Sequence, residues 1–269
     1  MEELRVEGIA GKTAIVTGGA SGLGAGLVRA FVRAGVNVAV ADILEPQGEQ
    51  LAAELGAGCL FRRTDLRSDA DIDQLLAATQ ARFGRIDFLI NLACSYAEQG
   101  LNSSRADWQA VFDINLFGHA MLIQKAVPFL EKSAGASVVN FSSASGHIAQ
   151  MGRWVYPATK AAIEQMTRSA ALELSARGIR VNALLPGMVG KRPEDYPSEE
   201  AATRSAAMAA RSSMLARLQQ PDEVAEAALF LCSSHARFVT GSCLKVDGGY
   251  TALGPMAREL HVPSRPASS

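Results

Sequence analysis

The chain has 269 residues, of which 48% are hydrophobic, and its formal net charge is -1. Domains of the α/β class often reach about 250 residues, so we expect a single domain with a large buried core. The nearly neutral charge offers no basic face to a phosphate-rich partner, and nucleic-acid binding is therefore not expected. No apolar run approaches the ~20 residues that a membrane-spanning helix needs, and the acidic start MEELRVEGIAGK does not resemble a secretory signal.

The cysteines form no CxxC pair and no other recognisable metal-ligand spacing. They are Cys59, Cys94, Cys232 and Cys243. The sequence therefore predicts reduced thiols in a cytoplasmic protein, and it predicts no metal site.

Short apolar runs alternate with longer amphipathic stretches along most of the chain. The predicted strands are residues 13–17, 36–41, 59–62, 86–93, 137–142, 179–185 and 243–246. Most of them are continuously apolar, which is typical of strands buried on both faces of a parallel sheet. Helical patterns occupy the stretch from Leu23 to Gly35 and residues 46–55, 69–83, 104–131, 156–176 and 221–233. This alternation predicts an α/β fold, a Rossmann-like doubly wound three-layer sandwich with a seven-stranded parallel sheet.

Two segments break the alternation. Residues 187–215 begin with Gly187 and follow the carboxyl end of a predicted strand, where ligands bind in open α/β sheets. We therefore expect a mobile substrate lid there. The tail 253–269 is rich in Pro and Ser, and we expect it to be poorly ordered.

A glycine-rich turn joins the first predicted strand to the first helix, with the sequence TGGASGLG at 17–24. Gly18, Gly22 and Gly24 permit a tight turn, close approach of a pyrophosphate and close contact between helix and strand. The helix start then directs amide groups and a positive dipole end at the phosphates. An ordinary strand–helix turn is the alternative, but the strand–turn–helix context favours a dinucleotide site.

Asp42 ends the second predicted strand, about where an acid accepts hydrogen bonds from the ribose hydroxyls of a dinucleotide. The same carboxylate would repel a 2′-phosphate, and neither Ser21 nor Ile43 supplies a compensating base. The sequence therefore predicts NAD rather than NADP. The alternative is that Asp42 only caps the turn that follows it.

Tyr156 and Lys160 stand four residues apart at the start of a predicted helix, which places both side chains on one face. Free tyrosine, with a pKa of about 10, is a poor base near neutrality. A neighbouring ammonium group and the positive nicotinamide ring would both favour tyrosinate. Ser143 ends a predicted strand upstream, and its hydroxyl could hold a substrate oxygen beside Tyr156. A serine in a polar turn is the alternative reading of Ser143.

Together these motifs resemble the short-chain dehydrogenase/reductase family in its compact single-domain form. The resemblance covers roughly residues 9 to 251 and rests on TGGASGLG, Asp65-Leu66, NLA at 91–93, Asn115, Ser143, YPATK at 156–160, Pro186-Gly187 and VDGG at 246–249. It implies a catalytic tetrad of Asn115, Ser143, Tyr156 and Lys160, in which Asn115 orients Lys160 through a water. It also implies a homotetramer.

The resemblance further implies a set of residues that line the site of the NAD cofactor. They are Gly18, Ser21, Gly22, Leu23, Gly24, Asp42, Asp65, Leu66, Asn91, Ala93, Tyr156, Lys160, Pro186, Gly187 and Val189. In this set, Asp65 and Leu66 would contact adenine, and Val189 would meet the carboxamide. For Asp65, an N-cap of the following helix is an equally good reading.

The sequence departs from the family pattern at Leu92, Cys94 and Lys191. Leu92 replaces a polar residue, so packing must take the place of its hydrogen bonds. Cys94 replaces a glycine next to the cofactor and substrate. It either narrows the pocket or, as we expect, is tolerated, and no thiolate role is expected for it. Lys191 replaces a threonine that, in the family, binds the nicotinamide amide, so backbone groups near Val189 would have to make this contact. Lys191-Arg192 form either a solvated loop pair or an anion contact.

The expected substrate site comprises Ser143, Tyr156, Cys94, His147, Trp154 and Met188. Its apolar members favour a cyclic or aromatic alcohol over a sugar. Neither His147 nor His119 has a partner carboxylate at a telling spacing, so no catalytic role is assigned to them, and His119 is expected at an interface or on the surface.

The sequence thus predicts an NAD-dependent oxidoreductase that interconverts a secondary alcohol and its ketone. A 3-oxoacyl-thioester reductase and a cyclic dihydrodiol dehydrogenase are alternatives with the same fold. A non-catalytic nucleotide-binding scaffold is the alternative of another class, but the presence of both Tyr156 and Lys160 opposes it.

Overall fold

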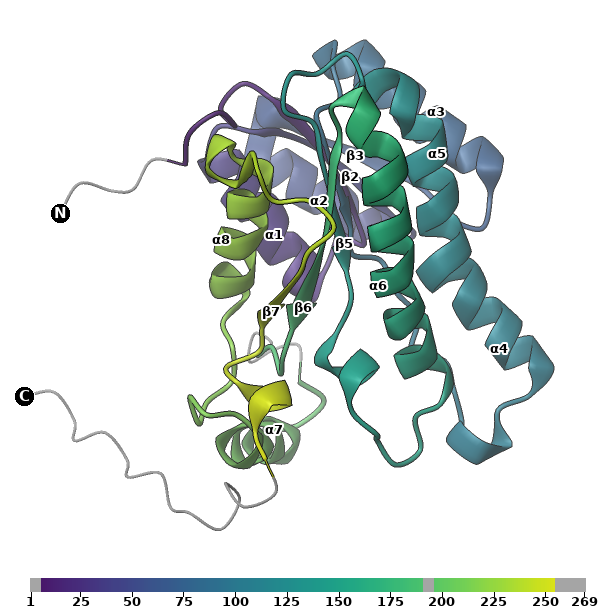
Figure 1. The fold of residues 1–269 in the computed structure, drawn as a ribbon, viewed down its shortest axis with the longest axis vertical. Coiled ribbons are helices and arrows are strands. Elements are labelled where there is room, and N and C mark those ends of the chain that lie inside the picture. Colours follow the sequence, from purple (N-terminus) through teal and green to yellow (C-terminus); the bar gives the residue numbers. More distant parts are fainter. Residues whose placement is uncertain (1–5, 191–195, 255–269) are drawn as a thin grey trace, which may run out of the picture.

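A seven-stranded parallel sheet forms the centre of the molecule (Figure 1), with the strand order β3-β2-β1-β4-β5-β6-β7. The structure is a computed structural model that describes residues 6–190 and 196–254. The strands are β1 (Thr13–Thr17), β2 (Asn37–Asp42), β3 (Cys59–Arg63), β4 (Phe88–Asn91), β5 (Ser137–Phe141), β6 (Arg180–Pro186) and β7 (Cys243–Val246). The order reverses direction between β1 and β4, which is where open α/β sheets bind their ligands.

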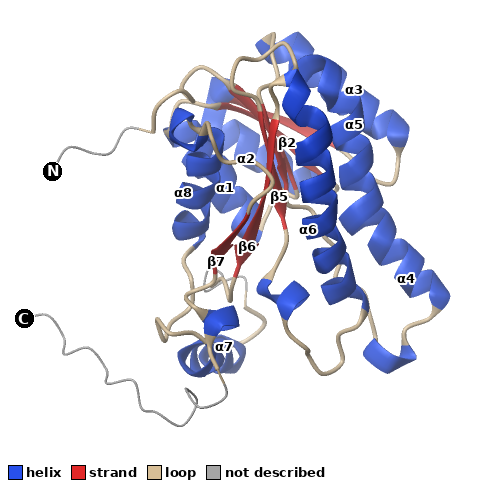
Figure 2. Ribbon diagram, in the orientation of Figure 1, coloured by secondary structure: helices blue, strands red, loops and turns tan. Residues whose placement is uncertain are grey.

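Helices cover both faces of the sheet (Figure 2). Their bounds are α1 (Gly22–Arg33), α2 (Glu45–Leu55), α3 (Asp69–Phe83), α4 (Arg105–Phe112), α5 (Gly118–Leu130), α6 (Val155–Leu174), α7 (Glu199–Ser212) and α8 (Pro221–Cys232). Helices α1, α2 and α8 pack on one face, and α3, α5 and α6 pack on the other. The predicted fold class is therefore confirmed, including the doubly wound three-layer architecture.

The continuous apolar runs of the central strands are buried on both sides, as the pattern predicts, whereas the edge strands β3 and β7 are only partly buried. Every residue of β1, β4 and β5 is buried. One apolar cluster fills the space between the sheet and helices α1 and α8, and a second lies between the sheet and helices α3, α5 and α6. No helix within the described residues is long and apolar enough to cross a membrane.

Two parts of the chain differ from the predicted elements. The single helix expected at 104–131 is divided by a π-helical segment, Asp113–Phe117, between α4 and α5. The segment 187–215, for which a mobile substrate lid is predicted, contains the helix α7, which Ser198 caps by accepting a bond from the Ala201 amide. Figure 1 places α7 beyond the carboxyl ends of β6 and β7. Lys191 and Arg192, and the tail from residue 255 onward, lie outside the described residues.

His119 of α5 corrects an expectation, because its side chain is fully buried rather than at the surface. Neither ring nitrogen has a hydrogen-bond partner among the described residues. Burial, and to a smaller extent the charge of Lys160, lowers the pKa of His119 to about 3. The ring is therefore neutral in the folded protein at physiological pH.

This buried histidine makes the free energy of unfolding depend on pH. The unfolded chain binds a proton at His119 below about pH 6.5, whereas the folded chain resists that proton down to about pH 3. Stability should therefore fall as the pH drops through this window. Between about pH 7 and about pH 5, the free energy of unfolding of the His119→Leu variant should fall by roughly 2 kcal/mol less than that of the wild type. Urea denaturation at both pH values measures the difference, and equal losses in the two proteins would contradict the assignment.

Candidate active site

A cavity of about 810 Å³ opens at the carboxyl ends of the strands. Its wall comes from the loops after β1, β2, β3, β4, β5 and β6 together with the first turns of α6. Of the predicted cofactor residues, all except Asn91 line this cavity. So do three of the predicted catalytic residues, Ser143, Tyr156 and Lys160. The fold thus brings together residues that are more than 100 positions apart in the sequence.

The glycines of the loop after β1 each meet a separate spatial demand. A Cβ atom on Gly24 would lie 1.9 Å from the Gly18 carbonyl oxygen, so only glycine lets α1 approach the strand this closely. Gly18 has a φ of +68° and presses against Ala93. At Gly22, with a φ of +50°, a Cβ would meet nothing within 4 Å, and the side facing the cavity is open. Ser21 precedes α1 without making a side-chain capping bond, so amides of the first turn are left for an anion.

Asp42 lines the cavity at the end of β2. Its Oδ2 accepts a hydrogen bond of 3.0 Å from the Ala20 amide, and its Oδ1 accepts one of 3.1 Å from the Leu44 amide. The carboxylate therefore braces the glycine-rich loop and also caps the following turn, as the alternative reading stated. Each oxygen has a further lone pair for a ligand hydroxyl.

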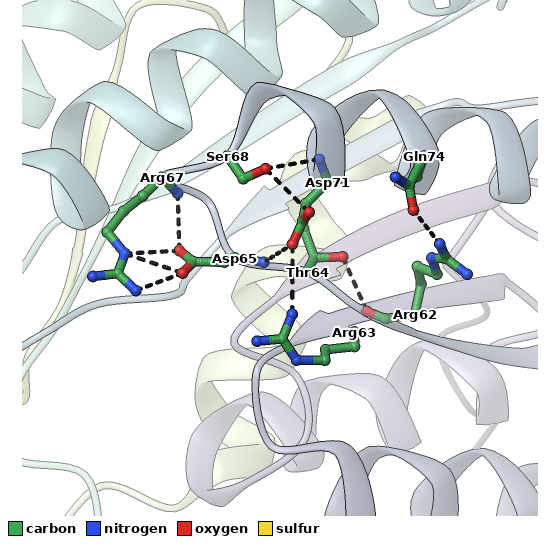
Figure 3. Close-up of polar contacts among 8 residues, drawn as sticks. All are labelled: Arg62, Arg63, Thr64, Asp65, Arg67, Ser68, Asp71 and Gln74. Atoms are coloured by element: carbon green, nitrogen blue, oxygen red, sulfur yellow. Dashed lines mark hydrogen bonds and ion pairs between the residues drawn. The ribbon is translucent and has the colours of Figure 1, made fainter.

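Asp65 and Leu66 line the cavity next to β3, and Figure 3 shows the Arg67 side chain folded against the Asp65 carboxylate. Arg67 Nε lies 2.9 Å from Asp65 Oδ1, and Arg67 also donates its backbone amide to that oxygen at 3.0 Å. The hydrogen bond from Arg67 holds the pKa of Asp65 below its usual value. The N-cap reading of Asp65 is wrong, because Ser68 caps α3 by accepting a bond from the Asp71 amide.

Tyr156 and Lys160 lie one turn apart on α6, and both side chains are almost entirely buried. Lys160 Nζ is 5.3 Å from the centre of the Tyr156 ring and donates a 2.7 Å hydrogen bond to the Phe141 carbonyl. Ser143 lines the same cavity, and its Oγ accepts a 3.1 Å bond from the Ser145 amide. That bond uses a lone pair, so the Ser143 hydroxyl proton stays available for a substrate oxygen.

Asn115 is fully buried within the π-helical segment and does not line the cavity. Its side chain instead connects two neighbouring elements. Oδ1 accepts a 2.6 Å bond from the Ser95 amide, while Nδ2 donates to the Ser95 carbonyl at 3.0 Å and to Thr159 Oγ1 at 3.1 Å. Thr159 directly precedes Lys160, so Asn115 braces the helix that carries the predicted acid–base pair. Such single-turn π segments are frequent at functional sites.

Asn91 points away from the cavity, in contrast to its expected place in the groove. It is fully buried and donates a 2.8 Å bond to Asn140 Oδ1, which ties β4 to β5. The neighbouring Leu92 packs against the apolar cluster below α1, as expected for a residue that has lost a polar side chain. The backbone at this point is held by Thr17, whose Oγ1 accepts from the amides of Leu92 and Ala93 at 3.0 and 3.1 Å.

The predicted substrate residues divide into two groups. Cys94 lines the cavity beside Ser143 and Tyr156, whereas His147, Trp154 and Met188 do not. Met188 lines a smaller cavity near α7 and β7. His147 has a carboxylate partner after all, since its Nε2 lies 2.9 Å from Glu164 Oε1 on α6. That partner is 17 positions away, too far for local spacing to reveal.

Sequence reasoning missed Tyr96, which lines the cavity above Tyr156. The two rings have centroids 4.5 Å apart and are tilted by 31°. Burial of its hydroxyl, followed by the influence of Cys94 and Tyr156, raises the pKa of Tyr96. The Arg153 guanidinium lies 5.7 Å from the centre of the Tyr96 ring. No motif marks these positions, and only the folded loop after β4 brings them to the site.

The surroundings of the cysteines predict how their thiols react. Burial raises the pKa of Cys59 to about 11 and that of Cys232 to about 12, so both should resist a thiol reagent until the protein unfolds. Cys94 and Cys243 are half-buried and should react in the folded protein. Mass spectrometry of labelled peptides would test this expectation. NADH at about ten times its Kd should slow labelling of Cys94 roughly tenfold and leave Cys243 unchanged, and equal rates at Cys94 with and without NADH would contradict its place in the cofactor cavity.

Comparisons with known proteins agree with this geometry. Residues 18–251 match the family model described as Enoyl-(Acyl carrier protein) reductase. The chain is 37% identical to the L-fucose dehydrogenase of Bos taurus, with 96% of this chain and 97% of that one covered. It is also 37% identical to the cis-4-hydroxycyclohexanecarboxylate dehydrogenase of Sinomonas cyclohexanicum (92% and 99% covered). The identity to the 2,5-dichloro-2,5-cyclohexadiene-1,4-diol dehydrogenase of Sphingobium indicum is 36% (91% and 99% covered).

These relatives align over nearly their whole lengths and are all dehydrogenases of CH–OH groups. The family model spans the glycine-rich loop, the Tyr156–Lys160 helix and the last strand. The chain therefore belongs to the short-chain dehydrogenase/reductase family and is an oxidoreductase that acts on a CH–OH group with a nicotinamide cofactor.

Proposed function

We propose that the protein oxidises a cyclic secondary alcohol to its ketone with NAD, and that Tyr156 is the base. The observation that carries this proposal is the single cavity lined at one end by the glycine-rich loop and Asp42 and at the other by Ser143, Tyr156 and Lys160. The predicted dinucleotide-binding residues and the predicted acid–base pair thus line one cavity, which supports the proposal.

The residues present fit NAD. The open side of Gly22 and the uncapped first turn of α1 form a cradle that suits a pyrophosphate. Asp42 offers free lone pairs to ribose hydroxyls, and its negative charge disfavours a 2′-phosphate. When bound, NAD would supply the acceptor for a hydride from the carbinol carbon.

The protein's own groups would handle the proton of the alcohol. Ser143 would donate its hydroxyl proton to the substrate oxygen, and tyrosinate at Tyr156 would take the hydroxyl proton as the ketone forms. The ammonium group of Lys160 would favour the tyrosinate form. Asn115 would keep Lys160 in place through Thr159. Ketone reduction uses the same groups in reverse.

The shape of the site supports a ring-shaped substrate. The half-exposed Tyr96 ring forms a flat apolar wall of the cavity beside Tyr156. Such a surface suits the face of a carbocycle. Two of the relatives are named for carbocyclic alcohols, a hydroxycyclohexanecarboxylate and a cyclohexadienediol, which supports this choice. The third is named for L-fucose, a sugar, so sugars belong in the substrate panel. Dehydrogenation of a cyclic dihydrodiol is included in the same proposal.

The experiment is a panel of cyclic secondary alcohols and ketones with NAD or NADH, followed by NADH absorbance. Matched open-chain alcohols and a 3-oxoacyl thioester serve as comparisons. We expect turnover with NAD and at least one cyclic alcohol, and little turnover of the thioester with NADPH. Thioester reduction with NADPH as the fastest reaction would replace the proposal with the reductase alternative.

We further propose that the protein is a homotetramer. Helices α5 and α6 are long, and the large apolar side chain of Leu172 on α6 is 81% exposed, while Phe117 next to α5 is 51% exposed. Burying such side chains between copies is favourable. Light scattering tests the state, and a stable monomer would overturn it.

A further inference from the structure

The first turn of α6 has no cap from its own sequence, although it carries Tyr156. Trp154 at the N-cap position has φ −118° and ψ −44°, and its side chain makes no capping hydrogen bond. The amides of a helix's first turn have no partner inside the helix, and buried amides need one. Val155 is fully buried and Tyr156 nearly so. A partner must therefore come from elsewhere in the fold.

Glu98, in the loop after β4, is that partner. Its Oε2 accepts hydrogen bonds from the amides of Trp154 at 2.6 Å and Val155 at 2.7 Å, and its Oε1 accepts one from the Tyr156 amide at 3.3 Å. The Glu98 side chain is only 2% exposed. A buried carboxylate at the positive end of a helix dipole is a strong cap, because charge-assisted hydrogen bonds add to the dipole attraction.

The same loop also contacts the ring of Tyr156 and the side chain of Asn115, two of the predicted catalytic residues. Tyr96 packs against the Tyr156 ring, and the backbone of Ser95 exchanges two hydrogen bonds with Asn115. We propose that Glu98 is a positioning residue for the acid–base step: it fixes the backbone of Tyr156, and its charge contributes to the electrostatics of the Tyr156 hydroxyl. This role rests on the proposed function of Tyr156 as the base.

The charges around Tyr156 predict in which direction the loss of the Glu98 charge should change the ionisation of the Tyr156 hydroxyl. Lys160 Nζ lies 5.3 Å and the Arg153 guanidinium 6.0 Å from the centre of the Tyr156 ring, so both place positive charge beside it. Glu98 opposes them, and Arg153 Nη1 lies 3.9 Å from its Oε1. The remaining titratable neighbours in this loop are Tyr96 and Cys94. From α5, the fully buried His119 is neutral. Removing the Glu98 charge should therefore favour tyrosinate, and removing the Arg153 charge should disfavour it.

The experiment compares Glu98→Gln, Glu98→Ala and Arg153→Gln with the wild type. Three quantities are measured for each protein: Tm, NADH affinity by fluorescence, and the pH dependence of kcat for a cyclic alcohol that the wild type oxidises. Glu223→Gln is the matched control, because Glu223 is a carboxylate that caps α8 by accepting a 2.7 Å bond from the Gln220 amide, and α8 contributes nothing to the cavity. A wild type that oxidises no alcohol refutes the proposed function itself, which is a separate result.

We expect Glu98→Gln to lower kcat about tenfold with little change in NADH affinity. The acid limb of its pH profile should move to lower pH by roughly half a unit or more, whereas Arg153→Gln should move the limb to higher pH. Glu223→Gln should lower only Tm. Loss of a purely structural cap lowers Tm but has no reason to move the acid limb downward. The proposal is overturned if Glu98→Gln has the kcat and the acid limb of the wild type. It is also overturned if the acid limb of Glu98→Gln moves to higher pH.

Glu98→Asp keeps the experiment decisive if the other Glu98 variants do not fold. It retains the charge and shortens the side chain by one methylene group. We expect its acid limb to stay at the wild-type pH while kcat falls, because the charge is present and the cap is displaced. A wild-type kcat in Glu98→Asp would overturn the positioning role.

Discussion

Tyr156→Phe is expected to lower kcat by roughly 10²–10⁴-fold, the range that one positioned acid–base group contributes. The substitution removes only the hydroxyl oxygen. The ring can keep its packing against Tyr96, at a centroid distance of 4.5 Å, and the backbone can keep its bond to Glu98. NADH affinity, measured by fluorescence titration, should therefore stay close to that of the wild type.

Thr167→Val is a suitable control for Tyr156→Phe, because it also deletes a buried hydroxyl from α6. Thr167 Oγ1 accepts a 2.9 Å bond from Asn140, and neither residue lines the cavity. Its loss should lower Tm with little effect on kcat. Turnover within a few-fold of the wild type in Tyr156→Phe would mean that the base is a different residue.

Asp42→Ala combined with Ile43→Arg is expected to exchange the cofactor preference. Loss of the carboxylate removes charge-assisted hydrogen bonds to the ribose hydroxyls, each worth about 1.5–3 kcal/mol, so kcat/KM for NAD should fall by roughly 10–100-fold. The 2′-phosphate of NADP would then meet an arginine in place of a carboxylate. Ile43 is 59% exposed beside the cavity, so a longer side chain has room there.

The single variant Ile43→Ala controls for the change in shape, and it should retain the preference for NAD. Steady-state kinetics with both cofactors provide the measurement. A wild type that prefers NADP, or a double variant with an unchanged ratio of kcat/KM values, would remove Asp42 from the ribose site.

The sheet could be predicted from the sequence because strands buried on both faces leave an unambiguous record. The fully buried β1 has the predicted bounds 13–17, and the longer apolar run at 86–93 contains the fully buried β4. The edge strand β7 also has its predicted bounds, 243–246, although it is only partly buried. The glycine-rich loop was recognisable for a similar reason. At Gly24 no other residue fits against the Gly18 carbonyl, so the spatial constraint appears directly in the sequence.

Contacts between segments that are distant in the sequence produce no local sequence pattern and could not be predicted. Glu98 caps a helix that starts more than 50 positions later, and Glu164 binds His147 across 17 positions. His119 sits in a helix whose pattern does not distinguish burial from an interface, and only packing shows that it is enclosed. The π-helical segment at 113–117 was also missed, since a helical period does not reveal one inserted residue. Sequence patterns therefore located the glycine-rich loop, Tyr156 and Lys160, which line one cavity, but not the groups that hold them in place.

The proposed reaction is tested most directly by following the hydride. A cyclic alcohol that carries deuterium on its carbinol carbon is oxidised with NAD, and the NADH is analysed by mass spectrometry. The account predicts NADH that carries the deuterium, formed by the wild type and almost absent with Tyr156→Phe. NADH without deuterium, or a protein that binds NADH yet transfers no hydride from any cyclic alcohol, would contradict it.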